Sequence, residues 1–102
     1  MLDRAGERAA VVAVLARLQH AAPGRAVEVR IPPYAAIQII EGPRHTRGTP
    51  SAVVEMDAKT LLELDAGTLS WQDGVAAGVI RASGERSDLA HLFPDVTGRL
   101  LT

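Results

Sequence analysis

The apolar residues near the start of the chain recur with the period of an α-helix. The positions that share one face are Val11, Val14, Leu15 and Leu18, spaced i, i+3, i+4 and i+7. This spacing predicts a helix over residues 2–21, which Pro23 and Gly24 close. Upstream, the stripe reaches Glu7 and Arg4 instead of apolar residues, so we expect the first turns to be solvated, frayed or packed against another molecule.

The same helix has a second, weaker apolar face, formed by Leu2, Ala5, Ala9 and Val12. A helix that is apolar on two sides is rarely satisfied by one small sheet. We therefore expect the first face to pack on the domain and the second face to pair with another copy of the chain. This arrangement predicts a homodimer.

Two strand-like runs follow the helix. Alternation over residues 26–31 places Val27, Val29 and Ile31 on one face of a half-buried strand. A Pro-Pro pair then interrupts the run, because proline has no N–H to donate to a sheet. Residues 34–40 are apolar on nearly every position, so we expect this second strand to be more central than the first.

Residues 41–51 have no apolar periodicity and are predicted to form a loop. A short apolar strand comes next, and Asp57 then caps a helix by accepting free N–H groups of its first turn. Gly67 ends this helix, because glycine adopts the left-handed conformation without a steric cost. Ser70 caps a second, short helix, which Gly78 ends.

The order of these elements predicts the fold class. Three strand-like runs precede the helices, and one run, at residues 79–83, follows them. We expect residues 26–31, 34–40 and 51–56 to pair as an antiparallel unit that residues 79–83 join. The prediction is an α+β fold with a mostly antiparallel sheet of about four to five strands, covered on one face by helices.

Length and composition limit the classes of function. The chain has 102 residues and is expected to form one domain: residues 1–24 as the N-terminal helix, 25–93 as the core and 94–102 as a tail. Its 11 basic and 12 acidic residues give a net charge of -1, so we expect no nucleic-acid partner. The absence of cysteine suits a cytoplasmic location. No apolar run approaches the roughly 20 residues that span a bilayer, so stable membrane insertion is not expected.

Candidate chemistry is sparse. The three histidines lie in separate predicted elements, so no metal site, cofactor or catalytic residue is expected. In the polar loop, Arg44, His45 and Arg47 could together bind a carboxylate or phosphate. The alternative is that these arginines pair with Glu41 or Glu55 across a hairpin.

A larger pattern runs through the second half of the chain. Its positions are Val54, Asp57, Leu61, Leu64, Gly67, Leu69, Val75, Ala76, Gly78, Ile80, Ala82, Gly84 and Glu85. This order of strand, capped leucine-bearing helix, small helix and glycine-flanked strand resembles the sterol carrier protein type two family over residues 25–93. The resemblance is strongest to the short sterol-carrier-like domains of bacteria.

The resemblance implies binding or transfer of an apolar ligand, such as a lipid, a sterol-like molecule or a fatty acyl chain, in an internal tunnel. The residues that would line this tunnel are Ile37, Ile39, Val54, Leu61, Leu64, Trp71, Val75, Ile80, Leu89 and Leu92. Each of them is equally interpretable as an ordinary core residue, and Trp71 would either fill the core or face the ligand.

The free-energy cost of an empty cavity indicates whether such a tunnel can stay open. An empty apolar pocket of ~300 Å³ would cost roughly 7 kcal/mol, which is comparable with the ~5–15 kcal/mol total stability of a domain. We therefore expect the tunnel to be collapsed or filled. Two alternative functions stay open: an accessory module with a filled core that binds a partner protein, and an enzyme that uses the loop from Arg44 to Arg47.

Overall fold

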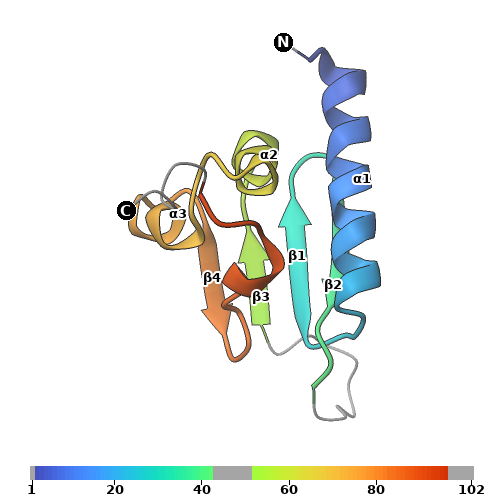
Figure 1. Cartoon of the computed structure of the whole chain (residues 1–102). Helices are drawn as coiled ribbons and strands as arrows, with labels where there is room; N and C mark the ends of the chain where they lie inside the picture. Colours follow the sequence, from blue (N-terminus) through green and yellow to red (C-terminus); the bar gives the residue numbers. More distant parts are fainter. Residues whose placement is uncertain (1, 43–51, 97–102) are drawn as a thin grey trace.

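The computed structural model describes residues 2–42 and 52–96. The elements in chain order are α1 (Arg4–Ala21), β1 (Val27–Ile31), β2 (Ala35–Ile39), β3 (Ala52–Glu55), α2 (Ala58–Ala66), α3 (Trp71–Ala76), β4 (Arg81–Gly84) and the short 3-10 helix η1 (Ala90–Leu92). Figure 1 shows the long helix α1 on one side of the molecule and the shorter helices on the other. The predicted elements are present.

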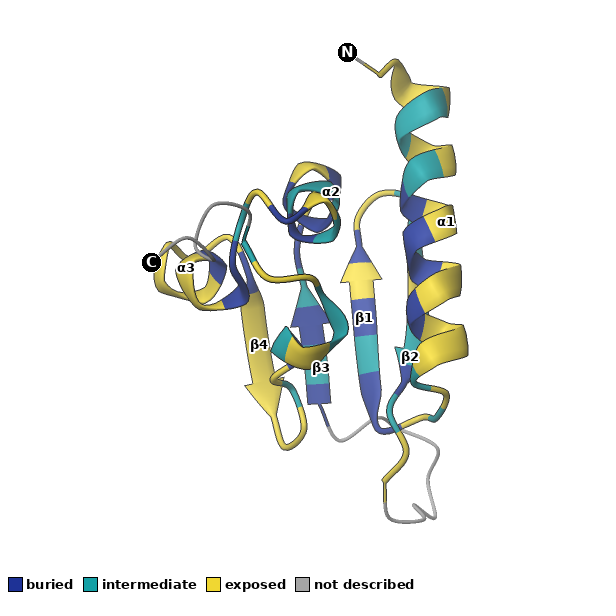
Figure 2. Cartoon of the chain, viewed as in Figure 1, coloured by how far each residue is buried: buried dark blue, intermediate teal, exposed yellow. Residues whose placement is uncertain are grey.

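Helix α1 packs as its periodicity predicts. Its buried residues are Val11, Val14, Leu15 and Leu18, whereas Leu2, Ala5, Ala9 and Val12 are exposed, and Figure 2 shows the helix buried on one side only. The first turn is exposed at Arg4 and Ala5, which agrees with the solvated alternative. The Asp3 carboxylate accepts the N–H of Gly6 at 2.8 Å, and the Tyr34 hydroxyl donates to Glu7 at 2.6 Å. These contacts hold the start of α1 within its own chain.

The four strands form one sheet in the order β2-β1-β3-β4. β1 pairs with β2 and β3 pairs with β4 in antiparallel fashion, but β1 and β3 are parallel. The sheet is therefore mixed, and the predicted antiparallel unit of the first three runs is wrong at this pair. The expected central place of the second strand is also wrong, since β1 is central and β2 lies at an edge. Its apolar composition comes partly from small alanines and from contact with α1.

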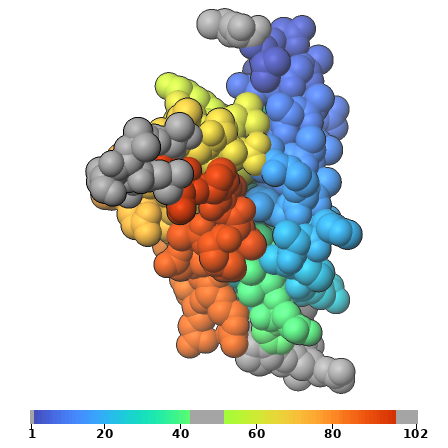
Figure 3. Space-filling view, in the orientation of Figure 1, coloured from blue at the N-terminus to red at the C-terminus, as the bar shows by residue number. Residues whose placement is uncertain are grey.

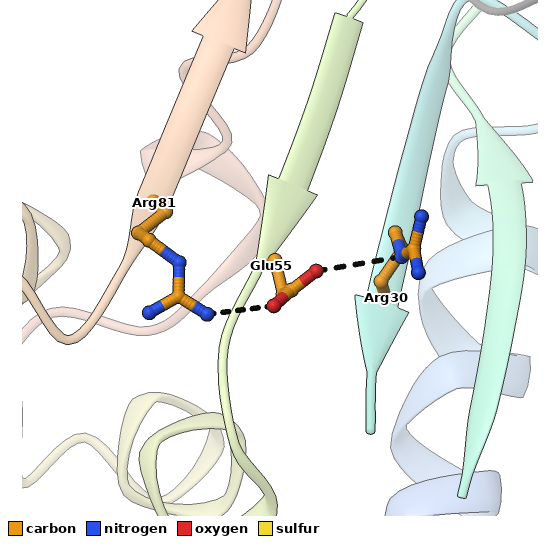
Figure 4. A network of polar contacts seen from close by, with 3 residues as sticks. All are labelled: Arg30, Glu55 and Arg81. Atoms are coloured by element: carbon orange, nitrogen blue, oxygen red, sulfur yellow. Dashed lines mark hydrogen bonds and ion pairs between the residues drawn. The ribbon is translucent and has the colours of Figure 1, made fainter. Parts of the chain in front are cut away.

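The two faces of the sheet differ. Alternate residues of the inner face, Val27, Val29, Ile39 and Val54, are 0% exposed beneath the helices. On the opposite face, Glu55 of β3 binds Arg81 of β4 at 2.6 Å and Arg30 of β1 at 3.4 Å. Figure 4 shows these three side chains in front of the sheet, with the helices behind it. The helices thus cover one face, as predicted, and the other face is polar.

The predicted helix caps are confirmed. Asp57 accepts the N–H of Thr60 at 2.9 Å at the start of α2, and Gly67 ends α2 in the left-handed conformation with φ 77°. Ser70 accepts the N–H of Asp73 at 3.0 Å at the start of α3. Because each cap is a contact between near neighbours in sequence, these helix boundaries follow from local chemistry.

Candidate functional site

The candidate site is the apolar layer between the inner face of the sheet and the helices. Nine of the predicted lining residues belong to or pack against a single hydrophobic cluster: Ile37, Ile39, Val54, Leu61, Leu64, Trp71, Ile80, Leu89 and Leu92. Val75 is instead 44% exposed, on the outer side of α3. The other predicted group, Arg44, His45 and Arg47, lies outside the described residues.

Each helix contributes to this layer from a position set by its local sequence. Leu61 and Leu64, one turn apart on α2, are both 0% exposed. On α3, Gly74 brings the helix backbone close to Ile80, since a Cβ at this position would lie 2.4 Å from the Ile80 Cδ1. Trp71 stands at the start of α3 and is 7% exposed. The layer is therefore closed by side chains from β3, α2, α3 and the segment before β4.

The segment around η1 completes the cover over this layer. Leu89, the residue before η1, is 0% exposed, and Leu92 and Phe93 pack against the same cluster. We call residues 89–93 the cover segment. Its helical part has only 3 residues, and the Asp88 carboxylate accepts the N–H of Ala90 at its start at 3.0 Å. In Figure 3 this part of the chain lies on the surface between α1 and the region of α2 and α3. The cover segment thus buries apolar side chains with little secondary structure of its own.

An aromatic pair borders the cover segment. The rings of Trp71 and Phe93 are stacked, with their centroids 6.2 Å apart and an interplanar angle of 15°. They line a hollow of about 170 Å³ together with Ser70, Gln72, Ala90, Pro94, Asp95 and Val96. The sequence pattern singled out Trp71 but did not pair it with Phe93. Their scarcity was a usable signal, since the whole chain has one tryptophan, one tyrosine and one phenylalanine.

The polar groups of this hollow are few and specific in kind. Ser70 is 8% exposed, and its oxygen already accepts the N–H of Asp73, so its O–H hydrogen is left to donate. Asp95 contributes a carboxylate, and Gln72 an amide. None of the described residues that line the hollow is an arginine, lysine or histidine. The hollow therefore offers an apolar aromatic wall, one buried hydroxyl that can donate, one amide and one carboxylate.

A second hollow, of about 420 Å³, lies between the start of α1, the turn that joins β1 to β2, and the start of α2. Its charged residues are of both signs: Asp3, Arg4, Glu7, Asp57 and Lys59. The hydrogen bond to Glu7, followed by burial, raises the pKa of Tyr34. Hydrogen bonds from Thr60, first its hydroxyl and then its N–H, lower the pKa of Asp57. The hydrogen bond between Tyr34 and Glu7 joins α1 to the turn between β1 and β2, whereas Asp3 and Asp57 cap their own helices.

Metal ligands and membrane-spanning helices are the two other features that bear on function within residues 2–42 and 52–96. No group of histidine, aspartate or glutamate side chains in these ranges is arranged to hold a metal ion. No helix within the described part of the chain is long and apolar enough to cross a membrane.

Comparison with known proteins agrees with this geometry. Among solved structures, the chain is similar to the crystal structure of sterol carrier protein 2 like 2 from Aedes aegypti, with 17% sequence identity, a TM-score of 0.52, and coverage of 85% of this chain and 96% of that chain. At this identity the likeness shows the fold alone, an α+β fold. No curated protein matches the chain. A family model described as "Bacterial SCP ortholog" matches residues 3–95. The chain therefore belongs to this family of bacterial sterol carrier protein (SCP) orthologues.

Proposed function

We propose that the protein binds an apolar ligand of the lipid or fatty acyl class, without catalysing a reaction on it, between the sheet and its helices. The observation that carries the proposal is the cover segment, which buries Leu89 completely although its helix has only 3 residues. Such a segment can be displaced at lower cost than a long helix, because few backbone hydrogen bonds are lost with it. Family membership supports lipid binding in general.

The free energies of apolar burial support a mechanism in which a ligand displaces the cover segment from the core. Full burial of an apolar side chain contributes about 1.5–3 kcal/mol, so lifting the fully buried Leu89 together with the half-buried Leu92 and Phe93 costs no more than roughly 5–9 kcal/mol. An acyl chain gains roughly 0.8 kcal/mol for each methylene group that it buries. About ten buried methylene groups therefore offset the displaced side chains. Affinity should rise with chain length, because only longer chains give a surplus over this cost.

Trp71 makes binding measurable in the unmodified protein, because it is the only tryptophan in the sequence and stands against the cover segment. The experiment titrates the protein with long-chain carboxylic acids, alcohols and esters that carry bromine on the chain, which quenches nearby indole fluorescence. Saturable quenching that strengthens with chain length is expected. If none of these ligand classes quenches Trp71 saturably, carriage is wrong, and an accessory module that binds a partner protein becomes the better account.

A matched pair of variants tests the role of the cover segment. Leu92 and Leu62 are both half-buried leucines that pack against the core, and only Leu92 belongs to the cover segment. Leu92→Ala and Leu62→Ala should each lower stability by about 1–3 kcal/mol. Only Leu92→Ala should also tighten ligand binding, roughly tenfold, because the ligand then displaces less buried surface. Equal affinities in the two variants would contradict displacement of the cover segment while leaving ligand binding itself standing.

A further inference from the structure

We propose that the open edge of β4 binds an extended segment of a partner protein as an added strand of the sheet, and that this segment carries alternating apolar and acidic side chains. The inference goes beyond the proposed function and does not depend on it, because it concerns an outer surface of the molecule. It assigns a role to the edge strand and to the exposed valines beside it.

The backbone of β4 is open on one side. The strand stands at the end of the sheet, next to β3 (Figure 1), and all of its residues, Arg81–Gly84, are exposed (Figure 2). Within residues 2–42 and 52–96, its backbone pairs with β3, and the Gly84 carbonyl also accepts the Ser87 hydroxyl at 2.8 Å. The other outward N–H and C=O groups of β4 can therefore pair with an extended segment from another molecule.

The usual protection of a sheet edge is weak at β4. Such edges are commonly guarded by charged side chains, by proline or by a bulge. β4 contains no proline, and its register with β3 is continuous. Its charged residue, Arg81, is drawn over the polar face, where it binds Glu55 at 2.6 Å (Figure 4). The residues that follow, Ala82, Ser83 and Gly84, have small side chains, so the backbone is accessible from the side, although 4 residues accommodate only a short segment.

A hollow of about 480 Å³ follows this edge and shows which side chains a docked strand would meet. Arg81, Ala82 and Ser83 all line it, although their side chains alternate between the two faces of the sheet. Val75 of α3 lines it as well and is 44% exposed, and Val79, close before β4, is 43% exposed. An added strand would place alternate side chains beside these valines, which favours apolar residues at those positions.

On the polar face, charge favours an acidic segment. Arg81 and Arg30 share the carboxylate of Glu55, at 2.6 Å and 3.4 Å, so the three side chains together are positively charged. Asp57 also interacts with Arg81, and Lys59 balances its charge. The Arg81 guanidinium has more N–H donors than its contact with Glu55 uses. An acidic side chain on the docked strand would therefore be attracted to Arg81, and a basic one would be repelled.

The test titrates the protein with short labelled peptides and follows fluorescence anisotropy. One peptide alternates valine with glutamate, and the second alternates valine with lysine. The third is the glutamate peptide with methyl groups on its central backbone nitrogens, which removes the donors needed for strand pairing. The glutamate peptide should bind saturably and roughly fivefold more tightly than the lysine peptide at low salt, with a smaller difference at high salt. The methylated peptide should not bind, and the NMR amide shifts caused by the glutamate peptide should concentrate at residues 81–84.

Matched variants test the two kinds of side-chain contact. Arg81→Gln should remove the preference for the glutamate peptide, whereas Arg8→Gln, at an exposed arginine of α1, should leave it unchanged. Val75→Ser should weaken binding roughly threefold, because part of the apolar contact is lost. Val12→Ser should not weaken it, since Val12 is similarly exposed, at 47%, but lies on α1. Circular dichroism checks that each variant is folded.

Several results would overturn the inference. Equal binding of the methylated peptide, or amide shifts away from residues 81–84, would exclude docking at the edge of β4. Equal affinities for the glutamate and lysine peptides would exclude an acidic partner. If no peptide binds and the β4 amides exchange slowly with solvent, a second copy or another part of the chain already occupies the edge; if they exchange fast, the edge binds nothing. None of these results changes the proposed ligand binding, which the quenching of Trp71 tests separately.

Discussion

At the scale of single residues, the tightest constraint lies between α1 and the end of β2. Gly24 has φ 150°, and a Cβ at this position would lie 2.1 Å from the carbonyl carbon and oxygen of Ile40. The Ile40 carbonyl also accepts the N–H of Ala26 at 2.9 Å, and the Ile40 N–H donates to the Ala22 carbonyl at 2.8 Å. The sequence predicts that Gly24 ends a helix. It carries no sign that the backbone of Ile40 passes against it.

Gly24→Ala should therefore be much more destabilising than an alanine substitution that meets only a backbone penalty. Gly78 provides the matched control, because it has φ 79° and open space around the added Cβ. We expect Gly78→Ala to cost about 1 kcal/mol and Gly24→Ala about 3 kcal/mol or more, since it adds a clash with backbone atoms. Urea unfolding of both variants measures the difference. Equal losses of stability would show that the approach of Ile40 imposes no constraint.

At the scale of elements, the features that could be predicted are those with a local cause. The caps of α2 and α3 depend on residues three positions apart, Asp57 with Thr60 and Ser70 with Asp73. The buried face of α1 follows from helical spacing. The parallel pairing of β1 with β3 could not be predicted, because alternation gives the faces of a strand and not its direction or its neighbour.

The same distinction applies to the candidate site. Leu61 and Leu64 are recognisable as buried because α2 is long enough to show a period. Helix α3 has only 6 residues, too few to tell its inner side from its outer side, and Val75 is accordingly exposed. The meeting of Trp71 with Phe93 joins residues that no local pattern connects. The sequence therefore predicts which residues are apolar, and only the fold brings the aromatic pair to one hollow.

The cap of α2 should make stability depend on acid. Hydrogen bonds lower the pKa of Asp57 in the folded state, so its contribution is complete above the unfolded pKa and is lost as the pH falls through the folded pKa. Asp57→Ala should cost about 1 kcal/mol at neutral pH, and much less in acid. Asp57→Asn keeps an acceptor for the N–H of Thr60, so it should retain most of the stability and lose the acid dependence. Denaturant unfolding at neutral and acid pH checks both, and an unchanged acid dependence in Asp57→Asn would argue against this cap as its source.

At the scale of the whole molecule, the second face of α1 stays a predicted contact between two copies of the chain. Leu2 and Val12 on this face are 55% and 47% exposed. Val12→Arg should place a charge in the centre of the contact and convert a dimer to a monomer in light scattering. Val75→Arg is the control, since Val75 is 44% exposed on a different helix, and it should leave the mass unchanged. A mass of 10.8 kDa for the unmodified protein at every concentration would exclude the dimer.

The strand order described above also has a consequence for the way in which the chain folds. β2 and β1 lie next to each other in both sequence and space, and so do β3 and β4 with the helices between them. The half made of β1 and β2 can form from contacts that are near in sequence, at a small entropic cost of loop closure. The half made of β3 and β4 closes the longest connection between paired strands, residues 56–80, within which α2 and α3 form locally. The ladder between β1 and β3 joins the two halves across residues 32–51. We therefore expect the pairing of β1 with β2 to be the first part of the sheet to form, and the two pairings of β3 to be the later and slower steps of folding.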